Sequence, residues 1–178
     1  MQTFWAKGFE ATSVDDLCES TGLGRSSLYA AFGDKRELYL RALDRYEQDA
    51  VTRVATALAG PTPIRKSIAA FLGRIIDDIV SGRGRRGCFI GNCAAELPRG
   101  DREAVTQVRR SLARVEKLFC EAFTRAKASG EISARSDVTA LARFFTAGIQ
   151  GLRLVGKANP DRKALEDIAM VMLQALDA

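Results

Sequence analysis

Residues 13–32 read SVDDLCESTGLGRSSLYAAF, a pattern of two short amphipathic helices joined by a glycine turn. The hydroxyl of Ser13 or Thr12 can cap the first helix, whose apolar side chains follow at helical spacing. Gly22-Leu23-Gly24 supplies a left-handed turn, and a second helix is expected over Arg25–Phe32. Two short helices about such a turn can place the second helix in the major groove of DNA.

The second predicted helix begins with groups that suit a nucleic-acid contact. Its free backbone N–H groups and the hydroxyls of Ser26 and Ser27 can bind phosphates. Arg25 is the one side chain at this helix start that can pair bidentately with a guanine edge. The pattern therefore indicates DNA as the partner, and the alternative is a short helical pair inside an unrelated bundle.

Residues 8–38 resemble the N-terminal domain of the TetR family of bacterial transcriptional regulators. The segments GFEATSVDDL (8–17) and TGLGRSSLYAAFGDKREL (21–38) carry the resemblance, with the frame G-x-x-x-x-S-L-Y-x-x-F-x-x-K-x-x-L. Because that domain binds DNA, the resemblance implies which residues touch it. Backbone phosphates are assigned to Ser13, Tyr29 and Lys35, and the approach to bases is assigned to Arg25, Ser26, Ser27 and Ala31.

Three of these assignments have a structural alternative. Tyr29 is either a phosphate ligand or a packing aromatic residue. Lys35 is either a phosphate contact or a surface charge at a helix start. Ser13 is a helix cap with or without a role in DNA binding.

Two features depart from the usual pattern of the family. Ala30 and Ala31 stand where many members have an aromatic residue or histidine, so direct base reading falls mainly to Arg25. Only Met1–Lys7 precede Gly8, where the family has a basic arm and a longer first helix. We therefore expect either a late start or a missing arm. Residues 1–46 hold six Lys and Arg against seven Asp and Glu, a net charge of −1, which is consistent with a lost basic leader.

The rest of the chain is predicted to be helical between breaks at glycine and proline. No segment shows sustained alternation of β-branched residues, so the expected fold class is all-α, with about nine helices. Residues 1–46 are expected to form a three-helix helix-turn-helix domain, and residues 47–178 a helical bundle for ligand binding and dimerisation. Apolar stripes over 141–155 and 165–176 predict that the last two helices form a two-fold dimer interface.

Composition excludes several classes of function. The 178 residues include no histidine, so neither a Ser-His-Asp nor a Cys-His nucleophile system can be built, nor a zinc site containing histidine. We expect no enzyme activity, no metal and no cofactor. No run of about eighteen apolar residues and no signal peptide occurs, so a cytoplasmic protein is expected. The net charge of +5 suits an anionic partner, although the basic excess lies outside the predicted DNA-binding segment.

The resemblance also implies a cavity for a small-molecule effector in the helical bundle. Aromatic residues and nearby polar residues are its expected lining, and the alternative is that aromatic residues at helical spacing form the core. The expected lining consists of Phe71, Cys88, Phe89, Asn92, Cys93, Phe119, Phe123, Phe144 and Gln150.

Cys88 and Cys93 follow an arginine-rich segment, RGRR, at residues 83–86. Neighbouring arginines lower the pKa of a thiol, and the Gly-Cys pair at this junction resembles electrophile-sensing and oxidant-sensing members of the family. We hypothesise that Cys88 senses a reactive electrophile or oxidant and that Cys93 or Cys120 resolves it. The alternative is that Cys88 and Cys93 are buried packing residues behind a basic loop.

Together these features predict a homodimeric transcriptional repressor. It would bind a palindromic double-stranded operator and leave the operator when a small-molecule or electrophile effector reshapes the linking helices. One alternative is a thiol-based redox enzyme that uses Cys88 and Cys93. A second alternative is a ligand-binding family member that has lost DNA binding.

Overall fold

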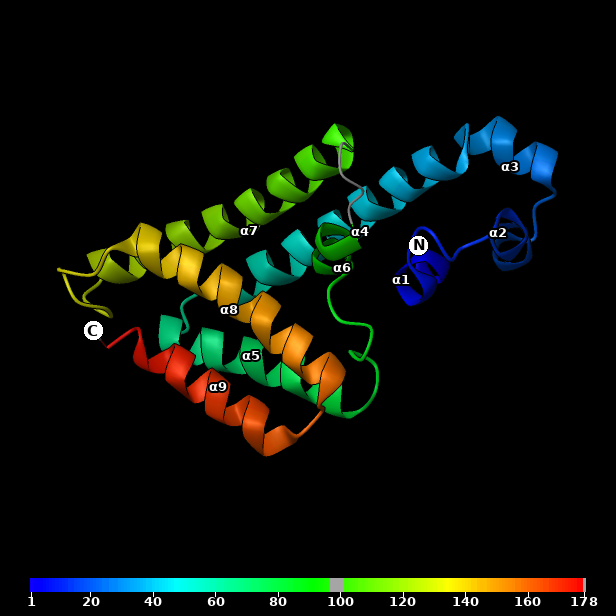
Figure 1. Cartoon of the computed structure of the whole chain (residues 1–178). Helices are drawn as coiled ribbons and strands as arrows, with labels where there is room; N and C mark the ends of the chain where they lie inside the picture. Colours follow the sequence, from blue (N-terminus) through cyan, green and yellow to red (C-terminus); the bar gives the residue numbers. More distant parts are fainter. Residues whose placement is uncertain (97–100, 178) are drawn as a thin grey trace. The chain divides into compact units, whose positions relative to one another are not determined.

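The described part of the computed structural model, residues 1–96 and 101–177, is built from α-helices (Figure 1). These ranges contain nine helices and no strand, which confirms the expected all-α fold class. Within them, no helix combines the length and apolar character needed to cross a membrane. In chain order the helices are α1 (Gln2–Lys7), α2 (Val14–Thr21), α3 (Arg25–Phe32), α4 (Lys35–Leu58), α5 (Ile64–Val80), α6 (Phe89–Glu96), α7 (Arg102–Ala128), α8 (Val138–Ala158) and α9 (Arg162–Gln174).

The chain divides into two compact units. The first unit comprises Met1–Asp49 and Phe89–Ser111, and the second comprises Ala50–Cys88 and Leu112–Ala178. The first segment of this unit ends at Asp49, within α4, three residues after the boundary expected at residue 46. The first unit also includes α6 and the start of α7, which the sequence places in the C-terminal bundle. The packing of the first unit explains this difference.

An aromatic cluster holds α6 in the first unit. Phe89, at the start of α6, lies edge to face with two rings of α4, with centroid distances of 5.6 Å to Tyr39 and 5.8 Å to Tyr46. From α1, Phe4 lies 5.1 Å from Tyr39 and Trp5 lies 5.0 Å from Tyr46. Aromatic side chains bury large areas and favour edge-to-face contacts. α1, α4 and α6 therefore share one core.

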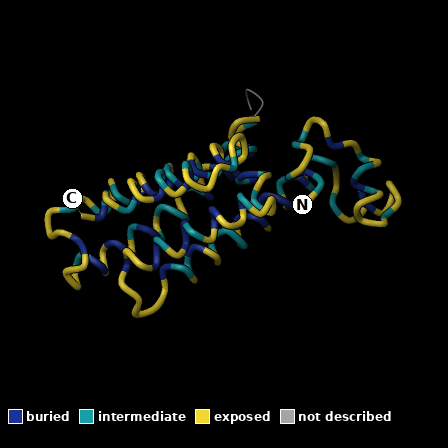
Figure 2. Tube along the Cα trace, turned by 90° about the horizontal axis from the view of Figure 1, so that it is seen from below, coloured by how far each residue is buried: buried dark blue, intermediate teal, exposed yellow. Residues whose placement is uncertain are grey.

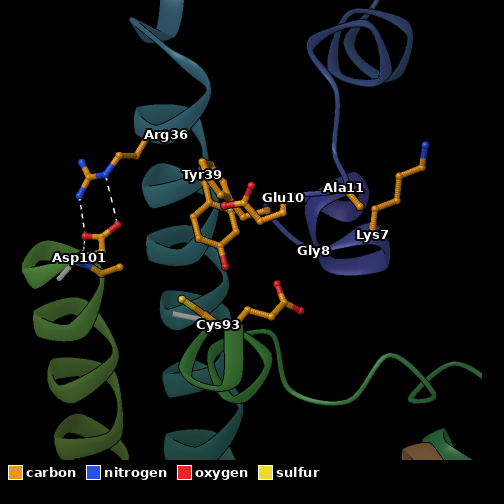
Figure 3. Close-up of a pocket in the computed structure, with 11 residues that line it drawn as sticks. Lys7, Gly8, Glu10, Ala11, Arg36, Tyr39, Cys93 and Asp101 are labelled. Atoms are coloured by element: carbon orange, nitrogen blue, oxygen red, sulfur yellow. Dashed lines mark hydrogen bonds and ion pairs between the residues drawn. The ribbon is translucent and has the colours of Figure 1, made fainter. Parts of the chain in front are cut away.

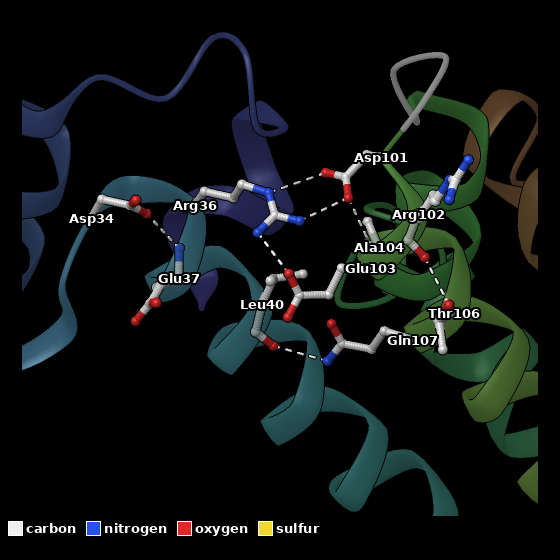
Figure 4. Close-up of polar contacts among 10 residues, drawn as sticks. All are labelled: Asp34, Arg36, Glu37, Leu40, Asp101, Arg102, Glu103, Ala104, Thr106 and Gln107. Carbon is white, nitrogen blue, oxygen red and sulfur yellow. Dashed lines mark hydrogen bonds and ion pairs between the residues drawn. The ribbon is translucent and has the colours of Figure 1, made fainter.

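Polar contacts fasten the first turns of α7 to α4 within the first unit (Figure 4). Arg36 donates hydrogen bonds to Asp101 and to Glu103, each at 2.8 Å. Gln107 Nε2 donates to the Leu40 carbonyl at 2.9 Å. The hydrogen bonds from Arg36 lower the pKa of Asp101. Because the side chain of Arg36 is 40% exposed, each ion pair contributes at most about 1 kcal/mol.

α5 is the interior helix of the second unit and packs against α8 and α9. Gly156 of α8 comes so close to α5 that a Cβ at this position would lie 2.7 Å from Ile79 Cδ1. Only glycine allows this approach without displacing Ile79. The buried stripe of α5 consists of Ile64, Ser67, Ile68, Phe71, Leu72, Ile75, Ile76 and Ile79. Figure 2 colours the trace by burial, with the buried segments in dark blue.

Three phenylalanines fill the second unit where α7 meets α8. Phe119, Phe123 and Phe145 are each 0% exposed. Phe145 lies 5.9 Å from Phe119 and 5.3 Å from Phe123 between ring centroids. These rings form the packed interior between the two helices.

Candidate nucleic-acid interface

Ser13 begins α2 through a reciprocal capping box. Its Oγ accepts a hydrogen bond from the Asp16 N–H at 3.0 Å, and its own N–H donates to Asp16 Oδ2 at 2.9 Å. A hydrogen bond from Lys7, together with those from Ser13, lowers the pKa of Asp16 to about 2. Ser13 is exposed, so its hydroxyl, which serves as an acceptor in the cap, still has a proton to donate to a phosphate.

Gly22 turns the chain between α2 and α3. Its φ of +69° lies in the left-handed region, and its N–H closes α2 by donating to the Cys18 carbonyl at 2.9 Å. α2 packs against α3, and Leu17 and Leu28 are the buried side chains of the two helices. Gly24 precedes α3 and supplies no side-chain cap, so the first N–H groups of α3 remain open to an anion.

The exposed face of α3 carries the residues that the sequence assigns to DNA. Tyr29 is 43% exposed, so its ring is not part of the core. Its side chain can therefore reach a phosphate, as the resemblance implies. The exposed residues of this helix are Arg25, Ser26, Ser27, Tyr29, Ala30 and Ala31.

Asp15 of α2 holds the guanidinium of Arg25 in a forked contact. Arg25 Nε donates to Asp15 Oδ1 at 3.0 Å, and Arg25 Nη2 donates to Asp15 Oδ2 at 2.8 Å. Both side chains are exposed. A guanine edge read by Arg25 would use the same pair of donors and would therefore have to displace Asp15. This pairing could not be predicted from the sequence, because the two residues are ten positions apart and meet only through the packing of α2 on α3.

Lys35 lies at the start of α4 and contacts the loop between α1 and α2. Its Nζ is 4.5 Å from the ring centroid of Phe9 and donates to the Glu10 carbonyl at 3.4 Å. The side chain is half-buried rather than freely solvated. These contacts fix the position of the ammonium group beside the segment that leads into α2.

The aromatic residues expected to line an effector cavity in the second unit have different surroundings. Phe71, Phe119 and Phe123 are buried members of its core. Phe144 is 43% exposed, and Gln150 is half-buried. Phe71, Phe119 and Phe123 are thus packed in the core of the second unit, and an effector cavity lined by them stays a prediction.

The other residues expected to line the effector cavity lie in α6 or directly before it. Phe89 belongs to the aromatic cluster of the first unit, Asn92 of α6 is half-buried, and Cys88 is the half-buried residue before the helix. Cys93 is 1% exposed and shares a hydrogen bond with the Tyr39 hydroxyl. All four cysteines are free thiols. Burial raises the pKa of Cys93, so its thiol is protonated near neutral pH.

A cavity of about 260 Å³ lies within the first unit (Figure 3). Its wall is formed by the loop between α1 and α2, the start of α4, the end of α6 and the start of α7. Of the expected effector-site residues, Cys93 is the one that lines it. Tyr39 and Arg36 of α4 line it as well, and the sequence analysis did not single them out for this role.

The capped α2, the left-handed glycine turn and the exposed polar face of α3 together define a helix-turn-helix DNA-binding protein. Residues 1–42 match the family model described as bacterial regulatory proteins, tetR family. Residues 64–172 match the model described as tetracyclin repressor-like, C-terminal domain. The chain belongs to the TetR family of transcriptional regulators, as the resemblance of residues 8–38 indicates.

Similar proteins cover nearly the whole chain. The HTH-type transcriptional repressor ComR of Escherichia coli K12 is 30% identical over 98% of this chain and 83% of ComR. The uncharacterized HTH-type regulator YezE of Bacillus subtilis is 29% identical over 99% of this chain and 92% of YezE. A cysteine mutant of the TetR-family regulator CifR, solved in complex with 26-bp double-stranded operator DNA, is similar with a TM-score of 0.85 and 29% identity. That similarity covers 97% of this chain and 91% of the CifR chain.

Proposed function

We propose that the protein is a homodimeric repressor that binds a palindromic operator and releases it on contact with a small-molecule or electrophile effector. The main support for the proposal is the exposed face of α3. This helix begins without a side-chain cap, and its exposed residues include Arg25, Ser26, Ser27 and Tyr29. Its chemistry matches phosphate binding and guanine recognition. The relatives ComR, a repressor, and CifR, solved with operator DNA, support the same activity for this chain.

Within this proposal the residues divide into two roles. Ser13, Tyr29 and Lys35 bind backbone phosphates, which sets the register of the protein on the duplex. Arg25 reads a guanine edge after it leaves Asp15. Ala31, exposed on the same helix with Ser26 and Ser27, offers an apolar contact to a thymine methyl group.

The last two helices support a two-fold interface. Nearly all the large apolar side chains that the described structure leaves exposed belong to α8 and α9. Two such helices from each protomer make an isologous four-helix interface that covers these side chains. They are Phe144, Leu154, Val155, Met170 and Val171.

The effector is proposed to be sensed in part through Cys88. This thiol is half-buried and follows the arginine-rich residues 83–86, whereas the buried, protonated Cys93 is the poorer nucleophile. Cys93 or Cys120 remains the proposed resolving thiol. Membership of a regulator family disfavours the alternative of a thiol-based redox enzyme. Mass spectrometry after stoichiometric N-ethylmaleimide tests the role, and an unmodified Cys88 in the native protein would refute it.

Operator binding is tested with DNA from immediately upstream of the protein's own gene. Fluorescence anisotropy is compared for the unaltered protein, Arg25→Ala and Tyr29→Ala, with Glu19→Ala on the exposed surface of α2 as the matched control. We expect each of the first two variants to weaken binding by about 1–3 kcal/mol and the control to bind normally. Affinity is also expected to fall steeply with salt, because phosphate contacts release counterions. Unchanged affinity in both variants would refute the assigned interface.

A further inference from the structure

We propose that the cavity of the first unit is a binding site for small amphipathic cations, in which an aromatic or aliphatic group fills the apolar interior and an ammonium group lies at Glu10 and Glu96. This site belongs to the unit that carries the helix-turn-helix, outside the core of the second unit where the effector cavity was expected. Ligand binding here does not depend on the operator proposal, because it can be measured without DNA.

The interior of the cavity is suited to an apolar group. Phe9 and Tyr39 line it with their rings tilted by 56° and centroids 5.0 Å apart. Ala11 and Ala104 line it with short side chains, which leave the space open. A volume of about 260 Å³ is enough for a ligand with a single ring.

The deep polar groups of the cavity are already satisfied and carry no charge. The Tyr39 hydroxyl and the Cys93 thiol hydrogen-bond each other, and Figure 3 shows the two side chains side by side. Burial raises the pKa of both groups, so both are neutral at physiological pH. A ligand group that reaches Tyr39 and Cys93 meets two neutral groups that already bind each other. An apolar ligand group is therefore favoured at this position over a charged one.

The charges around the cavity leave a negative excess. Arg36 is neutralised by Asp101, and Lys7, whose side chain extends away from the other lining residues in Figure 3, pairs with Asp16 at 2.7 Å. Two further carboxylates line the cavity, Glu10 and Glu96, and among the described residues they outnumber the one further cation beside it, Lys35, which contacts Phe9.

Neither of these carboxylates has an ion-pair partner among residues 1–96 and 101–177. Glu96 Oε2 lies against the backbone of the α1–α2 loop, since a Cβ on Gly8 would be only 2.7 Å from it. Glu10 is directed towards Tyr39 in the view of Figure 3. A positively charged ligand would compensate both carboxylates.

An aromatic ring that lines the cavity, Phe9, is already in contact with an ammonium group of the protein. Lys35 Nζ lies 4.5 Å from the centroid of the Phe9 ring, within the range of a cation–π contact. The negative face of an aromatic ring attracts any cation that is partly shielded from water. Because Lys35 already contacts the Phe9 ring, the ammonium group of the ligand is placed at Glu10 and Glu96, beside the Tyr39 ring, where the two carboxylates favour a cation over a neutral or anionic ligand of the same shape.

The test uses isothermal titration calorimetry on the full chain with three probes of similar shape: benzyltrimethylammonium, benzyl alcohol and benzoate. We expect saturable binding of the cation at one site per protomer and no saturable binding of benzoate. The double variant Glu10→Gln/Glu96→Gln is expected to weaken cation binding by about tenfold or more, because it removes both charges and keeps the side-chain shapes. The matched control Glu19→Gln, outside the cavity, is expected to bind normally.

Three outcomes would overturn the proposal. They are the absence of saturable cation binding to the unaltered protein, equal affinity for benzyl alcohol and the cation, and an unchanged affinity in the double variant. Circular dichroism establishes that the variants are folded. A second variant, Ala11→Leu, places a larger side chain at the exposed edge of the cavity and should block the cation without removing any charge.

Discussion

In the second unit α5 packs against α8 and α9 through aliphatic and aromatic side chains, whereas in the first unit α7 is fastened to α4 by charged and polar groups. The buried face of α5 is a stripe dominated by isoleucine, and one glycine of α8 touches it directly. At the α4–α7 contact Arg36 binds two carboxylates, and Arg110 pairs with Asp44 at 2.8 Å and with the buried Glu47 at 3.5 Å.

The two kinds of contact respond differently to substitution, salt and pH. Close-packed apolar side chains lose much free energy when an atom is removed or added, and pH and salt affect them little. Partly exposed ion pairs contribute little each, and salt or protonation weakens them. We therefore expect the second unit to tolerate core substitutions poorly, and the α4–α7 contact of the first unit to respond to salt and pH at small energetic cost.

The largest effect is expected from Phe145→Ala in α8. Its side chain is 0% exposed, so its removal should lower the free energy of unfolding by about 3–5 kcal/mol, measured by urea denaturation at fixed protein concentration. Tyr29→Ala is the control, because this aromatic side chain is 43% exposed, lies outside the proposed dimer interface and should cost far less to remove. Equal losses in the two variants would contradict the assigned core.

A pair of glycine substitutions tests the close packing of the second unit. Gly156→Ala puts a Cβ against Ile79 and should destabilise the protein by about 1–3 kcal/mol. Gly73→Ala in α5 meets no atom within 4 Å and should stabilise it by about 0.5–1 kcal/mol through helix propensity. Thermal unfolding distinguishes the two signs, and a stabilising Gly156→Ala would show that α8 does not approach α5 as closely as the structure has it.

The charged surface of the first unit is tested by Asp15→Asn. The change frees the guanidinium of Arg25 and removes a negative charge beside the expected phosphates, so operator affinity should rise about twofold to fivefold. Fluorescence anisotropy at several salt concentrations measures it, and Glu19→Gln is the control for a simple change of net charge. Weaker binding by Asp15→Asn would show instead that Asp15 supports the reading position of Arg25.

The smallest effect concerns the pH dependence of the α4–α7 contact. Arg36 lowers the pKa of Asp101 below its usual 3.8, so the stabilisation is fully present above that value and is lost as the pH falls through the lowered pKa. Asp101→Asn should remove less than about 1 kcal/mol at pH 7, because Arg36 is partly exposed. Urea denaturation of the unaltered protein and of Asp101→Asn from pH 7 down to pH 3 should show their free energies of unfolding converging. A difference that stays constant with pH would contradict an origin in the Arg36–Asp101 ion pair.

The helix-turn-helix could be predicted because its signals are local. The cap at Ser13, the left-handed Gly22 and the apolar spacing of both helices act within one or two turns of the chain. The pairing of Asp15 with Arg25 could not be predicted, because it depends on how α2 packs against α3. The sequence pattern also gave no means to separate core phenylalanines from cavity lining, since helical spacing is the same for both.

The all-α fold, the turn at Gly22–Gly24 and the exposed side chains of α3 follow from local sequence, because helix caps, glycine conformations and apolar spacing depend on neighbouring residues. Three features depend instead on the folded molecule: α6 joins the first unit, Asp15 holds Arg25, and Cys93 lines a cavity. These features join residues that are far apart along the chain. Phe89 packs on Tyr39 and Tyr46, more than forty positions earlier, and such a contact forms only when the whole unit folds around one core.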